Sequence, residues 1–179
     1  MLVRSSYRVQ IITEALAARG IGSVGGGGDP LQGTAGRDWR QLLTTLRDVR
    51  AETVRKAALT SLVGWTLPQL VKAEADELDH LASTLRELSN LWQARGMAAL
   101  AEAVYSTFGL YERLLAVQGG TELLSDLITV AEACHQQTHL HHVTPDGLIQ
   151  WLAELRNDLE APARALQPAI DPVLAAVRD

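Results

Sequence analysis

Regularly spaced leucines constrain the fold more than any other feature of this 179-residue chain. Between residues 76 and 94, leucines recur at intervals of three and four residues, and Gly96 follows. This spacing places apolar side chains on one face of an α-helix, and glycine is typical of a helix end. Apolar residues make up 47% of the chain but aromatic residues only 4%, a balance that favours packed helices over sheets.

The same periodicity predicts helices along most of the chain. The expected segments are residues 35–47, 52–62, 76–94, 97–108, 110–117 and 121–138. Thr66 with Pro68, and Thr144 with Pro145, are typical helix starts, because the hydroxyl can cap free N–H groups and proline suits the first turn. We therefore expect a mainly α protein whose body, residues 34–179, is an irregular helical bundle.

The first 33 residues have a different pattern. Two short apolar runs, residues 2–3 and 21–24, flank a helical segment, which predicts a small strand-helix-strand (βαβ) unit. The glycines Gly25, Gly26, Gly27 and Gly28 then predict a hinge between two domains. A phosphate loop is disfavoured because Asp29 and Pro30 follow, where such a loop needs lysine and serine or threonine. The edge of the first strand could pair with another chain.

Charge is unevenly distributed. The net charge is −5, yet residues 1–56 carry nine basic and five acidic side chains, whereas residues 57–179 carry seven and sixteen. Contact with a polyanion is therefore expected in the first third of the chain. The single cysteine excludes an internal disulfide, no apolar run reaches the ~18 residues of a membrane span, and the first residues do not resemble a signal peptide. These features predict a cytoplasmic protein without membrane contact.

Histidines near residue 140 are candidate metal ligands. His135 and His139 lie four residues apart, and His141 and His142 follow. A zinc site needs three or four ligands in fixed geometry, and the His-Glu-x-x-His pattern is absent. We therefore expect a histidine-rich helix end without a metal, and Cys134 as a small core residue.

Tryptophans are expected mainly in the core, because each one is surrounded by leucine and alanine. They are Trp39, Trp65, Trp92 and Trp151. Trp39 also lies between Arg37 and Arg40, where it could instead stack on a nucleic-acid base.

An ordered series of short motifs occupies residues 1–46. It comprises Leu2-Val3-Arg4-Ser5-Ser6-Tyr7-Arg8-Val9-Gln10, Glu14-Ala15-Leu16, Gly20-Ile21, Gly25-Gly26 and Gly36-Arg37-Asp38-Trp39-Arg40-Gln41-Leu42-Leu43. The series resembles superfamily 1 DNA helicases of the UvrD/Rep/RecB type, where it belongs to the second RecA-like domain (2A) and leads into a helical insertion (2B). Residues 55–60 and 63–66 look most like the actinobacterial members. The resemblance implies a 2A fragment in residues 1–33 and a 2B-like domain in residues 34–179.

The resemblance also implies a function for the parent protein. A helicase of this type couples ATP hydrolysis, with Mg²⁺, to 3′-to-5′ movement on DNA in repair and recombination, and an exodeoxyribonuclease V-like nuclease can accompany it. Domains 1A, 1B and 2A would be partners of this segment. Arg4 and Arg8, and then Arg37 and Arg40, are the expected DNA contacts, because the planar guanidinium pairs well with phosphate. DNA binding by the isolated segment should be weak at a net charge of −5.

Catalysis is not expected of this segment by itself. It contains no Gly-x-x-x-x-Gly-Lys-Thr and no Asp-Glu-x-x-Asp, and phosphoryl transfer needs that lysine and the magnesium carboxylates together. We therefore expect no catalytic residue, no cofactor and no ATP hydrolysis here. Two alternatives stay open: a stand-alone, all-helical protein-interaction module with no DNA role, and a histidine-liganded metal protein. The sequence also leaves open whether the parent carries a nuclease domain.

Overall fold

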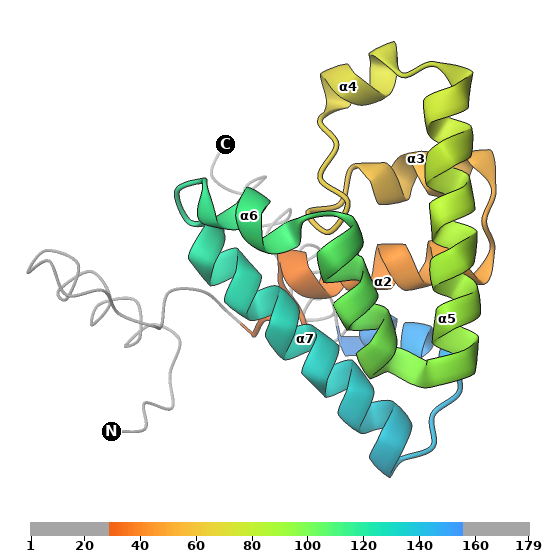
Figure 1. Ribbon diagram of the computed structural model, residues 1–179. Coiled ribbons are helices and arrows are strands. Elements are labelled where there is room, and N and C mark those ends of the chain that lie inside the picture. The colour runs from red at the N-terminus through yellow and green to blue at the C-terminus, as the bar shows by residue number, and fades with distance from the viewer. Residues whose placement is uncertain (1–28, 156–179) are drawn as a thin grey trace, which may run out of the picture.

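The computed structural model describes residues 29–155 and confirms a mainly α fold (Figure 1). Its helices are α2 (Thr34–Arg47), α3 (Ala51–Ala58), α4 (Leu67–Lys72), α5 (Ala75–Thr107), α6 (Leu110–Leu115) and α7 (Gly120–Leu140), and residues 145–155 are also helical. No strand occurs within these residues. The predicted βαβ unit and its edge strand, the Gly25–Gly28 hinge, and Arg4 and Arg8 lie outside the described part.

Helix α2 lies at the centre of the bundle and packs against α3, α5 and α7. Trp39, Leu42 and Leu43 are fully buried on it, and each such side chain contributes roughly 1.5–3 kcal/mol when removed from water. The indole Nε1–H of Trp39 donates a hydrogen bond of 2.9 Å to the carbonyl oxygen of Leu127 in α7. Trp39 is therefore a core residue, and the alternative that it stacks on a base is wrong, because its ring has no exposed face.

Helix α5 consists of two helices that meet at Gly96, as the sequence predicted. Gly96 has φ 78° and ψ −171°, a backbone conformation that essentially only glycine adopts. The chain changes direction there, and the second half of α5 runs back alongside α7 (Figure 1). In the first half, the hydroxyl of Ser89 donates a 2.6 Å hydrogen bond to the carbonyl oxygen of Leu46, which holds this half against α2.

Two predicted helix starts are confirmed. The Thr66 hydroxyl oxygen accepts from the N–H of Gln69, whose side chain accepts from the N–H of Thr66 at 2.8 Å, so α4 begins with a reciprocal capping arrangement. The Thr144 hydroxyl oxygen accepts from the N–H of Gly147 at 3.2 Å, ahead of the helix that begins at residue 145. Helix α4 has no buried residue and projects from the bundle (Figure 1).

Two predicted helix ends were too late. The helix expected over 52–62 ends at Ala58, because the Thr60 hydroxyl donates to the carbonyl oxygen of Ala57 at 2.6 Å and the chain turns through Gly64 at φ 84°. Leu62 is nevertheless fully buried in this turn. The helix expected over 110–117 ends at Leu115. Among the described helices, none is both long and apolar enough to cross a membrane.

Candidate functional site

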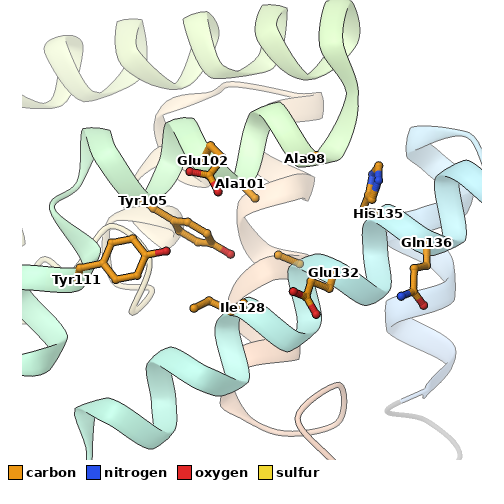
Figure 2. Close-up of a pocket in the computed structure, with 10 residues that line it drawn as sticks. Ala98, Ala101, Glu102, Tyr105, Tyr111, Ile128, Glu132, His135 and Gln136 are labelled. Atoms are coloured by element: carbon orange, nitrogen blue, oxygen red, sulfur yellow. The ribbon is translucent and has the colours of Figure 1, made fainter.

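A half-open cavity of about 260 Å³ lies between the second half of α5, the start of α6 and the middle of α7 (Figure 2). Small side chains line the space: Ala98 and Ala101 on α5 and Ala131 on α7. Two tyrosines and two glutamates lie at its walls and rim, together with His135 and Gln136 on α7. A volume of this size is below the roughly 300–1,000 Å³ of typical small-molecule sites, so the cavity suits one long side chain better than a nucleotide.

Tyr105 is the unusual residue of the cavity. Only 5% of its surface is exposed, yet its hydroxyl group has no hydrogen-bond partner among the described residues. Its ring makes edge-to-face contacts with Trp39 (centroids 6.3 Å apart, 73° between planes) and with Tyr111 (5.8 Å, 78°). Buried hydroxyl groups are normally paired, so an orphan hydroxyl at a cavity wall calls for an explanation.

The surroundings of the Tyr105 hydroxyl are both apolar and negatively charged. Burial raises the pKa of Tyr105 above its usual range, and neighbouring Tyr111, Glu102 and Glu132 raise it further. Glu102 on α5 and Glu132 on α7 are exposed at the rim, and neither forms an ion pair within residues 29–155. Figure 2 shows the two glutamates on facing helices, with the Tyr105 side chain reaching into the space between them.

Sequence reasoning missed this cavity. The three-residue interval from Glu102 to Tyr105 places both on one side of α5, which is a weak signal. The facing residue Glu132 lies 27 positions after Tyr105 in the chain, so only the packing of α5 on α7 brings the groups together.

The predicted DNA contacts that the structure describes lie on α2. The Arg37 side chain is 59% exposed and its Nε is 3.4 Å from the carboxylate of Asp38. Arg40, one turn later, is half-buried. The two arginines are neighbours on the surface of α2, because residues three apart in a helix lie next to each other. Their positions leave DNA binding by these arginines a prediction.

Asp38 and Arg113 fix the turn after α3. The buried Asp38 carboxylate accepts from the N–H (2.7 Å) and hydroxyl (2.6 Å) of Ser61. The Arg113 guanidinium donates to the carbonyl oxygens of Ser61 (3.0 Å) and Leu62 (2.8 Å), and burial lowers its pKa. A Cβ atom at Gly64 would meet the Arg113 guanidinium, so glycine is required where this side chain crosses the turn. The network is structural, because its polar groups satisfy one another.

The histidines and Cys134 are not grouped as ligands of one metal ion in the described part of the chain. His135 and His139 stack with centroids 5.8 Å apart at the exposed end of α7, and His141 and His142 follow. Within residues 29–155, no three histidine, cysteine, aspartate or glutamate side chains are placed to hold a metal ion. Cys134 is fully buried, as predicted, and burial raises the pKa of its thiol to about 12.

Comparison with known proteins points to one kind of relative. The RecBCD enzyme subunit RecB of Mycobacterium tuberculosis is 36% identical over 141 residues, which are 77% of this chain and 13% of the relative. RecB of Mycolicibacterium smegmatis is 33% identical over 146 residues (80% and 13%), and RecB of Escherichia coli 26% over 107 residues (59% and 9%). This chain is similar to a segment of RecB.

The similarity supports the RecB-like helicase superfamily that the motifs predicted. It leaves the assignment to one domain open, because the chain spans about an eighth of the length of the mycobacterial RecB subunits that it matches. No model of a protein family matches the chain.

Proposed function

We propose that this chain is the 2B helical region, with the adjoining start of 2A, of a RecB-like DNA helicase. The observation that carries the proposal is 36% identity to RecB over 141 residues. The mainly helical structure of residues 29–155 fits such an insertion. In the proposed parent, domains 1A, 1B and 2A bind ATP and Mg²⁺ and drive 3′-to-5′ movement in repair and recombination, and this segment contacts DNA and regulates unwinding.

Arg37 and Arg40 are the proposed phosphate contacts within the described residues, and Arg4 and Arg8 complete the proposed set. Adjacent guanidinium groups on one side of α2 can follow a phosphate backbone without reading its sequence. Each phosphate that is neutralised releases counterions from the DNA. On duplex DNA, the slope of log affinity against log salt should therefore change by about 0.9 for each arginine–phosphate pair removed.

DNA binding by the whole chain tests the proposal. A labelled duplex with a single-stranded tail should bind weakly, and its fluorescence anisotropy should fall as salt rises. The double variant Arg37→Gln, Arg40→Gln should reduce the salt slope by up to about two. The control pair Arg86→Gln, Arg95→Gln removes two exposed charges from α5 and should leave the slope nearly unchanged.

Three results would count against this reading. No binding even at low salt would favour the stand-alone interaction module, and equal losses in both double variants would mean that α2 is not the contact surface. A tight complex that salt does not weaken would also contradict it, because few phosphates can be neutralised by a chain of net charge −5.

ATP turnover gives a separate test of the proposed division of roles. The purified chain should hydrolyse no ATP, with or without single-stranded DNA, because the proposal places the phosphate-binding residues in the rest of the parent. The genomic sequence on both sides of this segment should encode a Walker lysine motif upstream and Leu-His-x-x-Lys-Gly downstream. Stimulated turnover by this chain, or flanks that lack both motifs, would refute the assignment.

A further inference from the structure

The cavity between α5, α6 and α7 has a set of groups that neither the RecB similarity nor the DNA-contact proposal uses. Around about 260 Å³ of space it combines two tyrosine rings, one orphan hydroxyl group and two carboxylates that form no ion pair within residues 29–155. We propose that this cavity binds an arginine side chain presented by another protein segment. The inference is independent of the proposed function, because it concerns the opposite kind of partner, a cation.

The two carboxylates at the rim of the cavity favour a positively charged ligand. Glu102 and Glu132 stand on facing helices at the rim, where their carboxylates can accept hydrogen bonds from a group entering between them (Figure 2). Such charge-assisted hydrogen bonds are roughly twice as strong as neutral ones. An anionic or phosphate-bearing ligand would meet like charge at the same rim, so nucleic acid is disfavoured at this site.

The aromatic groups select arginine over lysine. The guanidinium is planar and weakly hydrated, and it carries five donors in a fixed fork. It can lie against the ring of Tyr111, which is 44% exposed, while its N–H groups reach the carboxylates on both sides. A donor that enters fully would also meet the Tyr105 hydroxyl oxygen, which has no partner in the described chain. Ala101 and Ala131 leave room for the aliphatic part of the side chain.

The binding test uses the whole chain and a short peptide. In an NMR titration, acetyl-Gly-Arg-Gly-amide should shift the ring resonances of Tyr105 and Tyr111 in the millimolar range, because a single side chain is bound. The same peptide with citrulline keeps the shape but has no charge, and it should bind at least about tenfold more weakly. Peptides with lysine or leucine in the same place should bind less well than the arginine peptide.

Variants show whether the cavity is the site. The double variant Glu102→Gln, Glu132→Gln should weaken binding of the arginine peptide by about tenfold or more. Glu87→Gln, which changes another exposed glutamate on the first half of α5, is the matched control and should leave binding unchanged. Tyr105→Phe keeps the ring but removes the hydroxyl, and it should weaken binding of the arginine peptide several-fold. The NMR spectrum of this variant should still be that of a folded protein.

Several outcomes would overturn the proposal. These are absence of tyrosine shifts with the arginine peptide, equal binding of the citrulline or leucine peptide, and full affinity of the double glutamine variant. Stronger binding of the lysine peptide would also overturn it, because the fork geometry would then have no role. Shifts of the same resonances on concentrating the chain alone would overturn it in favour of a second copy as the occupant.

Discussion

Replacing Tyr105 by phenylalanine should stabilise this protein. The Tyr105 hydroxyl is buried without a hydrogen-bond partner among the described residues, and a buried polar group without a partner costs about 1–3 kcal/mol. Removing the oxygen leaves a void of about 10 Å³, which at ~24 cal/mol per Å³ costs only about 0.2 kcal/mol. The edge-to-face contacts with Trp39 and Tyr111 remain. The free energy of unfolding should therefore rise by about 1–2 kcal/mol.

Urea denaturation measures this change. With a slope near ~2 kcal/mol per molar urea, the midpoint of the Tyr105→Phe variant should increase by about 0.5–1 M at unchanged slope. Tyr111→Phe is the control, because Tyr111 is 44% exposed and its hydroxyl is not among the buried groups without a partner, so it should show almost no change. A Tyr105→Phe variant that is about 1 kcal/mol less stable would refute the reasoning, since that is the usual result when a tyrosine hydroxyl is hydrogen-bonded.

The pH dependence of stability gives a second test of the buried Tyr105. Burial raises the pKa of Tyr105 in the folded state, whereas in the unfolded chain it ionises near about pH 10. Below about pH 10 the phenol is protonated in both states and stability does not depend on pH through this group. Above that value the unfolded chain loses the proton first, so the free energy of unfolding falls as pH rises. Stability of the wild-type chain should fall more steeply above about pH 10 than that of Tyr105→Phe. Parallel curves for the two proteins would contradict a buried phenol.

Two further predictions concern Cys134 and Gly64. Burial raises the pKa of the Cys134 thiol from 9.0 to about 12. The thiol should therefore react with a thiol reagent about a thousandfold more slowly in the folded chain than in denaturant. Comparable rates in the two states would show that the thiol is accessible. Gly64→Ala should lower the free energy of unfolding by about 3 kcal/mol, because φ is 84° and the new Cβ displaces the Arg113 guanidinium. Gly109→Ala is the control: φ is 55° and the surroundings are open, so the same denaturation assay should show a loss of only about 1–2 kcal/mol. Equal losses would mean that Arg113 moves without cost.

Local chemistry explains how much of the fold was readable from sequence. The boundaries at Thr66, Gly96 and Thr144 were predictable because a capping hydroxyl, a proline or a glycine acts within one turn of its own position. The end of α3 was missed because Leu62 continues the apolar spacing although the backbone has already turned. Apolar periodicity reports burial, and burial continues through a packed turn.

Tertiary packing explains why the cavity was not predicted. Glu102 and Glu132 line one cavity only because the second half of α5 lies along α7. Likewise, Asp38 looks like an ordinary surface charge of α2 in the sequence, yet it is buried because Ser61, 23 residues later, supplies two donors. Neither association leaves a trace in the spacing of neighbouring residues.

The reversal at Gly96 joins a long straight helix to the second half of α5 through a single residue. The straight helix from residue 75 to residue 95 is about 30 Å long at ~1.5 Å per residue. A rotation of about 10° between the two halves of α5 would therefore displace the far end, next to α4, by about 5 Å relative to the cavity. The 2.6 Å hydrogen bond from the Ser89 hydroxyl to the carbonyl oxygen of Leu46 links this helix to α2 and resists that rotation. A small torsional change at this one glycine would therefore displace the end of the helix near α4, where Leu67 and Val71 face solvent, by several ångströms.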